Sequence, residues 1–306
     1  MKRPVRLAFL GDIHGNLPAL ESVLADIDKQ RPDAVFLLGD LINRCPWTLD
    51  VLDLLRQREW LSVQGNHDLV LAQLNTPDGS PIFDNRSRFP NIHWTWQQLR
   101  PQDLSYLRHL PHDLLIEIEG APPLRLFHGL PDNPFAGIVP NADEGSVASQ
   151  VAVYDEPILI CGHTHQPMDR TITAPHSTAH VPASQRGRQR ILNPGSVGMP
   201  YNGDPRAHYL LLDLVRENGQ LDWQPRFQRL AFDFERVART FHSSGLVESS
   251  GAIAKLNLRT IKDGQPWASD YQQWVRNQPH ELRSDPEAAV DLYLQTHGPS
   301  QWAFGG

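Results

Sequence analysis

Three times in its first 68 residues, the chain repeats a short apolar run that stops at a glycine followed by a polar residue. These runs end at Gly11-Asp12, Gly39-Asp40 and Gly65-Asn66. Between them, apolar residues recur at helical spacing over 17–30 and about 47–58. Strands that alternate with helices in this way predict a largely parallel α/β sheet. Its polar strand-end loops should then gather along one edge.

Two further loops of the same kind follow expected strands later in the chain. An expected hairpin over 114–118 and 124–127 leads to His128-Gly129, and the run Ile158–Ile160 leads to Gly162-His163-Thr164-His165. Taken singly, each loop could be an ordinary polar turn. Five of them at the same topological edge predict one shared site.

The polar side chains of these loops are those that bind transition metals. Seven are candidate ligands: Asp12, His14, Asp40, Asn66, His128, His163 and His165. Imidazole, carboxylate and amide donors together favour Mn²⁺ or iron, with Zn²⁺ also compatible, over Mg²⁺. Seven donors are too many for one ion and fit two ions that share a carboxylate, for which Asp40 is the best candidate. Two such ions can clamp the attacking and leaving oxygens of a phosphoryl transfer.

These five motifs, in this order, resemble those of the calcineurin-like metallophosphoesterase superfamily. They span residues 11–165, and three further segments extend the resemblance to the small prokaryotic phosphodiesterase branch: Asn193-Pro194-Gly195-Ser196-Val197-Gly198, Trp94–Leu99 and Leu107–Pro111. The resemblance implies a four-layer α/β/β/α sandwich with a dinuclear site at one sheet edge. It assigns one metal to Asp12, His14, Asp40 and His165, and the other to Asp40, Asn66, His128 and His163.

The resemblance also implies the catalytic residues. Hydrolysis would proceed by in-line attack of a metal-bridging hydroxide, without a covalent intermediate. His67 would stabilise the transition state or protonate the leaving oxygen. Asp68 would orient and charge His67, because an adjacent carboxylate raises the pKa of an imidazole.

Arg44 is the candidate substrate-binding residue. The segment Gly39-Asp40-Leu41-Ile42-Asn43-Arg44-Cys45-Pro46 resembles one in diadenosine tetraphosphatases and Ser/Thr protein phosphatases, where the arginine grips a substrate phosphate. Cys45 replaces the glycine of both families, and Gln64 replaces an arginine of the protein phosphatases. The second departure argues against a phosphoprotein substrate and leaves a dinucleotide substrate open.

The rest of the chain predicts how the domain is organised. We expect a metallophosphoesterase domain over 1–231, with an inserted helical cap at 75–110. A C-terminal helical extension over 232–306 should pack on the same domain, with a disordered tail.

The cap aromatics Trp94, Trp96 and Tyr106 have the spacing of core residues; if they line the cleft, they could stack a nucleobase. We expect His93, His109 and His112 to be structural or solvated. Arg186, Arg188 and Arg190 should form a solvated face, with contact to a distal phosphate as the alternative. The segment Leu130–Phe135 follows His128 closely enough to border the pocket, although the pattern does not single out Phe135.

Composition narrows the class of partner. The chain has 28 Lys and Arg against 35 Asp and Glu, a net charge of −7, which disfavours stable binding to nucleic acid or acidic membranes. Its two cysteines and the absence of a signal-peptide or spanning pattern favour a cytoplasmic protein.

The leading prediction is hydrolysis of small phosphodiesters or nucleotides. Alternatives are a dinucleoside polyphosphate hydrolase, a Ser/Thr phosphoprotein phosphatase, a nuclease and, last, a non-catalytic scaffold.

Overall fold

Two five-stranded sheets form the centre of the molecule. The computed structural model describes residues 4–173, 187–217 and 219–297. The first sheet has the order β10 (Gln220–Leu230), β9 (Ala207–Glu217), β1 (Arg6–Leu10), β2 (Ala34–Leu37) and β3 (Leu61–Ser62). The second has the order β4 (Asp113–Ile116), β5 (Leu124–Phe127), β6 (Ile158–Ile160), β8 (Arg188–Asn193) and β7 (Met168–Thr173).

Both sheets are mixed, whereas the sequence pattern predicted a largely parallel sheet. Strands joined through helices pair in parallel, as β1 does with β2 and β5 does with β6. Hairpin partners pair antiparallel, as β9 does with β10 and β4 does with β5. The difference has a simple cause: a short connection permits only antiparallel pairing, and a parallel pair needs a long crossover.

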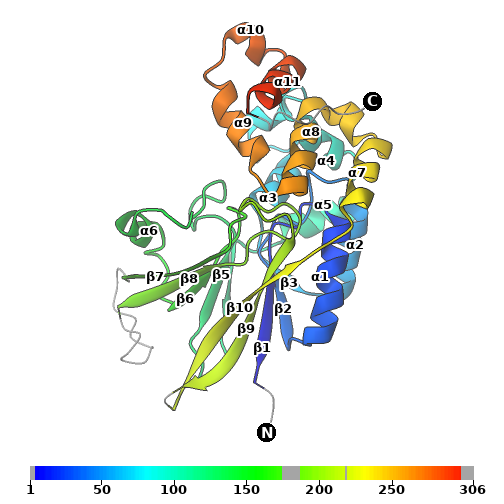
Figure 1. Ribbon diagram of the computed structural model, residues 1–306. Coiled ribbons are helices and arrows are strands. Elements are labelled where there is room, and N and C mark those ends of the chain that lie inside the picture. Colours follow the sequence, from blue (N-terminus) through cyan, green and yellow to red (C-terminus); the bar gives the residue numbers. More distant parts are fainter. Residues whose placement is uncertain (1–3, 174–186, 218, 298–306) are drawn as a thin grey trace.

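The helices cover the outer faces of the two sheets (Figure 1). The first sheet is covered by α1 (Leu17–Gln30) and α2 (Thr48–Arg58), and the second by α6 (Glu144–Gln150). Within β1, Leu7 and Phe9 pack against the second sheet, while Ala8 and Leu10 pack against the helices. This alternation follows from the two-residue period of a strand. The layers are therefore helix, sheet, sheet and helix, as predicted.

Short helices fill the expected cap region beside the strand ends. They are the 3₁₀ helix η1 (Pro81–Asp84), α4 (Pro90–Trp96) and α5 (Pro101–Arg108), and α3 (Asn66–Gln73) directly precedes them. The three cap aromatics Trp94, Trp96 and Tyr106 pack against the core between the first sheet and its helices. All three are partly buried by this packing, and none lines the cavity described below, so the alternative role in base stacking is not supported.

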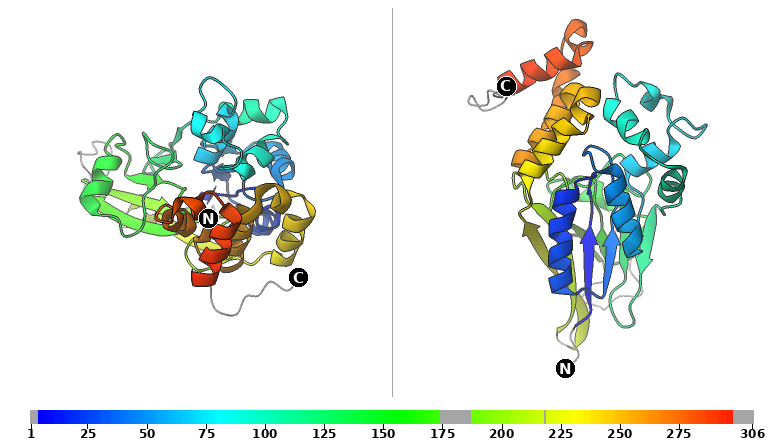
Figure 2. Two further views of the ribbon diagram at one scale, coloured as in Figure 1. Left: turned by 90° about the horizontal axis from the view of Figure 1, so that it is seen from above. Right: turned by 90° about the vertical axis from the view of Figure 1, so that its right-hand side faces the viewer.

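The C-terminal helices lie beyond the carboxyl ends of the strands, opposite the N-terminus (Figures 1 and 2). They are α7 (Phe234–Ser243), α8 (Leu246–Asp263), α9 (Trp267–Val275), α10 (His280–Arg283) and α11 (Pro286–His297). Helix α8 packs against α4 and α7, and α8, α9 and α11 enclose a small apolar core of their own. The expected boundary near 231 falls between β10 and α7, although the domain division stays a prediction. Arg186 and the tail 298–306 lie outside the described residues.

Candidate metal centre

The five predicted loops meet at one edge of the two sheets, where their side chains form two groups of donors. In the first group, ligand atoms of Asp12, His14, Asp40 and His165 all lie within 4.8 Å of one another, and all four residues are buried. His165 Nε2 lies 3.0 Å from His14 Nε2 and 3.2 Å from Asp12 Oδ1. These residues come from the ends of β1, β2 and β6, so the first group bridges both sheets.

The second group shares Asp40 with the first. It joins Asp40 to His128 and His163 within the same 4.8 Å limit. The Asn66 side chain completes this group, because its Oδ1 lies 3.1 Å from His128 Nε2 and 2.9 Å from His163 Nδ1. Asn66 was predicted to lie in a loop, but it is the first residue of α3. The structure thus brings all seven candidate ligands together around Asp40.

Backbone carbonyls determine which nitrogens of two histidines carry a proton. His165 Nδ1–H donates to the Met199 carbonyl at 2.5 Å, and His128 Nδ1–H donates to the Leu38 carbonyl at 2.6 Å. In the neutral rings, both Nε2 atoms therefore carry lone pairs that point into the site. There His165 Nε2 faces another acceptor, since it lies 3.2 Å from Asp12 Oδ1.

Facing lone pairs need a positive charge between them, and this requirement tests whether the residues fit metal ions. Asp12 Oδ2 is a buried acceptor with no hydrogen-bond partner among the described residues. Burial disfavours a charged His128, yet the Asp40 carboxylate outweighs it and raises the pKa of His128 to about 10. The site therefore attracts a cation, and its mixed nitrogen and oxygen donors suit transition metals. Both groups of residues could hold an ion.

Two other imidazoles, those of His14 and His163, favour the neutral form that binds metals. Burial lowers the pKa of His14 well below its usual value. Burial and the neighbouring His128 lower the pKa of His163 to about 4. Burial raises the pKa of Asp40, but the neighbouring His128 and His67 outweigh this effect and hold the pKa well below its usual range. Neutral histidines and a charged carboxylate are the protonation states required of ligands.

The backbone of the site is strained. Seven of its residues have left-handed φ values between 51° and 81°: Asp12, His14, Asp40, Asn43, Arg44, His163 and His165. Residues other than glycine rarely adopt this backbone conformation, and it persists only where the surrounding structure imposes it. Close approach of two loops provides part of that constraint, because a Cβ atom on Gly65 would lie 2.2 Å from the backbone nitrogen of Asp40. The strain marks this edge as a functional site.

The turn 193–198 holds two of the metal loops in place. Asn193 Nδ2 donates to the Gly162 carbonyl at 2.7 Å, and Ser196 Oγ donates to the Asp12 carbonyl at 2.7 Å. Beyond it, the Tyr201 ring stacks on His165 with centroids 4.2 Å apart. The sequence analysis did not single out Tyr201. Its position shortly after the turn 193–198, which resembles a segment of the family, could have indicated that it lies at the site.

Asp68 occupies a different position from the one predicted. Its carboxylate accepts hydrogen bonds from the backbone amides of Asp40 (2.8 Å), Leu41 (3.1 Å) and Gly65 (3.0 Å). It therefore ties the loop after β2 to the start of α3 and does not lie against the His67 ring. Burial and Arg44 lower the pKa of His67 to about 3 despite the opposing effect of Asp40, so the charging of His67 by Asp68 stays a prediction that this pKa does not support.

His67 is oriented by Asn43, a second residue that sequence reasoning missed. Asn43 Oδ1 accepts from the Arg44 backbone amide at 2.8 Å and from Thr95 Oγ1 at 3.2 Å. Its amide nitrogen, 2.7 Å from His67 Nδ1, is then the donor, which leaves the ring proton on Nε2. The Arg44 guanidinium lies 3.2 Å from that same Nε2, so Arg44 is at the site as predicted. Asn43 stands directly before Arg44 in the quoted segment, and that position could have indicated its role.

Comparison with known proteins agrees with this geometry. The family model described as the calcineurin-like phosphoesterase superfamily domain matches residues 5–217. The chain belongs to this superfamily. It is 26% identical over 251 residues to protein MJ0912 of Methanocaldococcus jannaschii, covering 80% of this chain and 95% of the relative. It is 27% identical over 223 residues to phosphodiesterase YfcE of Escherichia coli, covering 68% and 88%.

A solved structure extends the likeness to three dimensions. The metallophosphoesterase from Sphaerobacter thermophilus is 28% identical, covers 85% of this chain and 99% of its own, and superposes with a TM-score of 0.63. The predicted superfamily, fold and enzyme class, a phosphoesterase, are therefore confirmed. In the described part of the chain, no helix has the length and apolar character needed to cross a membrane.

Proposed function

We propose that this phosphoesterase uses two divalent metal ions to hydrolyse small phosphodiesters, including nucleotide esters. The observation that carries the proposal is the set of facing lone pairs around Asp40, which two cations would satisfy. Asp12, His14 and His165 would hold one ion, and Asn66, His128 and His163 the other, with Asp40 shared. Such a pair would polarise the phosphoryl oxygens and acidify a water molecule.

His67 and Arg44 form the part of the site that acts on the substrate. Arg44 Nε lies 3.3 Å from His67 Nε2 and can donate to it only when that nitrogen has no proton, whereas the tautomer favoured by Asn43 turns two donors toward each other. An anionic phosphate oxygen between the two donors would remove this conflict. In this arrangement Arg44 binds the phosphate, and the Nε2 proton of His67 is available to the leaving oxygen.

Gln64 supports a small substrate over a phosphoprotein. It occupies the position at which the protein phosphatases have a phosphate-gripping arginine. Here its side chain is buried, and its amide nitrogen donates to the Leu107 carbonyl of α5 at 2.7 Å. Gln64 therefore holds the cap and offers nothing to a phosphate.

A second candidate, hydrolysis of dinucleoside polyphosphates, is favoured by Arg44. Its guanidinium lies beside the donors around Asp40, where a phosphate distal to the reacting one could be gripped. A simple diester lacks that additional phosphate. The two candidates therefore differ in how strongly substrate preference depends on Arg44.

The experiment compares bis(p-nitrophenyl) phosphate with diadenosine tetraphosphate in Mn²⁺, using wild type, Arg44→Ala and the surface control Arg58→Ala. The proposal predicts efficient hydrolysis of the diester and similar losses for both substrates in Arg44→Ala. A strong preference for the dinucleotide that collapses only in Arg44→Ala would establish the second candidate. No turnover of either substrate with Mn²⁺, iron or Zn²⁺ would refute both.

A further inference from the structure

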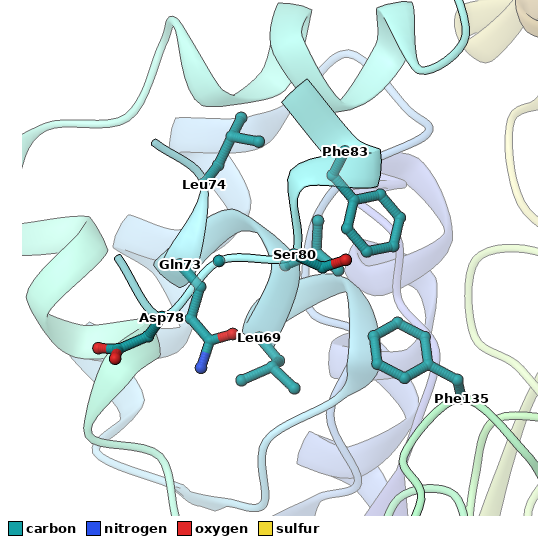
Figure 3. A pocket seen from close by; sticks show the side chains of 9 residues that line it. Leu69, Gln73, Leu74, Asp78, Ser80, Phe83 and Phe135 are labelled. Carbon is teal, nitrogen blue, oxygen red and sulfur yellow. The ribbon is translucent and has the colours of Figure 1, made fainter. Parts of the chain in front are cut away.

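A cavity of about 340 Å³ opens beside α3, at the foot of the cap. The rings of Phe83 and Phe135 border one side of it, and Leu69 and Gln73 lie across from them (Figure 3). Asp78 lines its far end. Its volume lies within the range of small-molecule sites in proteins.

Two walls of this cavity are built by segments that also carry the metal-site residues. Leu69, Val70 and Gln73 follow Asn66 on α3, so they lie within about 10 Å of it along the helix axis. This is the scale of the several bonds that separate a nucleotide's phosphorus from its base. The separation along α3 therefore matches the reach of a nucleotide held at the metal centre.

The second wall is the loop after β5, which connects His128 to Phe135. A Cβ atom on Gly129 would lie 2.5 Å from the Ala136 carbonyl, so this loop folds back closely next to His128. Two residues after Phe135, a Cβ atom on Gly137 would lie 2.7 Å from His163 Cδ2. Asn133 Oδ1 accepts from the Phe135 backbone amide at 3.0 Å. Phe135 is therefore placed by a loop that touches the metal centre.

The two phenyl rings are arranged as a stacking surface. Their planes are 18° apart, with centroids separated by 6.1 Å. The Phe83 backbone is held by buried His93, whose Nε2 donates to the Phe83 carbonyl at 2.8 Å. Phe135, by contrast, is 47% exposed and belongs to none of the apolar cores of the described chain. When a planar ligand covers an exposed aromatic ring next to an active site, apolar surface is buried and the two rings stack, and both effects favour binding.

The opposite side of the cavity offers polar groups without partners. The side chains of Gln73 and Asp78 form no hydrogen bond or ion pair within residues 4–173, 187–217 and 219–297. An amide can donate and accept, and a carboxylate accepts from N–H groups. Together with the phenyl pair, they match a flat ring whose edge carries N–H and carbonyl groups.

We infer that this cavity is a subsite for the nucleobase of the substrate, which stacks on Phe135 and presents its edge to Gln73 and Asp78. The inference rests on the proposed phosphodiesterase function and specifies its substrate class as nucleotide esters. Phe135 would be a specificity residue that touches the retained half of the substrate.

The test uses two substrates that release the same leaving group. They are the p-nitrophenyl ester of thymidine 5′-monophosphate and p-nitrophenyl methyl phosphate. We expect wild type to favour the nucleoside ester in kcat/KM, and Phe135→Ala to reduce that preference by about tenfold, the effect of losing one base stack. Phe135→Tyr, which keeps the aromatic face, should restore the preference. The control Leu115→Ala, which removes a similarly exposed apolar side chain on β4, should leave it unchanged.

The subsite is overturned if wild type does not favour the nucleoside ester, or if Phe135→Ala keeps the preference. If neither ester is hydrolysed, the proposed function fails, and binding then tests the subsite separately. In saturation-transfer NMR with thymidine, which has no phosphate, the base protons should receive saturation from wild type and lose it in Phe135→Ala. Equal transfer in both proteins, or none in wild type, would also overturn the subsite.

Discussion

The strand-end site and the C-terminal helices are stabilised in different ways. At the site, seven residues other than glycine hold left-handed backbone conformations, and the acceptors His165 Nε2 and Asp12 Oδ1 face each other in the interior. In α8–α11, by contrast, helices bury a cluster of aromatic and aliphatic side chains, and the kink in α8 falls at a glycine, Gly251. The site therefore carries strain and electrostatic repulsion that a ligand would relieve, while the helices gain their stability from packing. Substitutions in the two regions should affect different quantities.

His67→Ala should have the largest effect, and it should act on turnover alone. We expect kcat for bis(p-nitrophenyl) phosphate to fall by about 10²–10⁴ while both metals stay bound, because a positioned acid contributes this much. The loss should be greater for an alkyl ester, whose leaving oxygen needs a proton more. The control is His109→Ala, an exposed cap histidine. Full turnover by His67→Ala with metals bound would refute the role.

Tyr293→Ala should do the reverse and act on stability. The Tyr293 side chain is 3% exposed and packs against the rings of Trp267, Tyr271 and Trp274. Removing a buried aromatic ring destabilises a protein by about 3–5 kcal/mol. Urea unfolding should show this loss, while kcat per folded molecule stays at the wild-type value. Leu292→Ala, on the exposed side of the same helix, is the matched control and should change stability little. A lower kcat in folded Tyr293→Ala would mean that the two regions are coupled.

Asp68→Asn sharpens the comparison because Asp68 lies at the site and yet contacts only backbone amides in the hydrogen bonds described above. An asparagine would turn a donor toward one of those amides, and an unsatisfied buried group costs about 1–3 kcal/mol. We expect a lower unfolding free energy and a pH profile of kcat that keeps its shape. A shifted pH profile with unchanged stability would restore the predicted role of charging His67.

The metal site was more predictable than its surroundings because its chemistry restricts the residue types. Asp12, His14 and the other ligand candidates follow apolar runs and glycines, and the structure brings all seven together. Contacts that depend on side-chain direction were not predictable. Asp68 is adjacent to His67 in sequence, but in the first turn of a helix neighbouring side chains point apart, so Asp68 reaches the backbone of another loop.

The fold shows the same division between local and long-range information. The helix over 17–30 is confirmed residue for residue, because its apolar period and the Asn16 cap are local. The mixed pairing of the sheets and the cavity beside Phe135 depend on segments that meet only after folding. Nothing local to Phe135 could indicate that Phe83 would lie parallel to it.

Asp204→Asn should have the smallest effect, at the junction of the two regions. Gly203 N–H donates to the Gly264 carbonyl at 2.9 Å, and hydrogen bonding to Arg206 lowers the pKa of Asp204 to about 2. Because the pKa of Asp204 is lower in the folded chain than in the unfolded chain, where it is about 4, the carboxylate stabilises the fold at pH values above about 4. This stability is lost as pH falls towards 2. Solvent screening limits the gain to about 0.5 kcal/mol. Urea midpoints of wild type and variant should differ slightly at pH 6 and converge near pH 2; a larger gap at pH 2 than at pH 6 would contradict the assignment.

The most direct test of a metal pair that shares Asp40 is the metal content of wild type and Asp40→Ala after loading with Mn²⁺ and desalting, measured by plasma mass spectrometry. The account predicts two ions per wild-type chain. It predicts that the variant loses both together, because each group of ligands loses its common member. A fully occupied pair in Asp40→Ala, or a single ion in wild type, would contradict it.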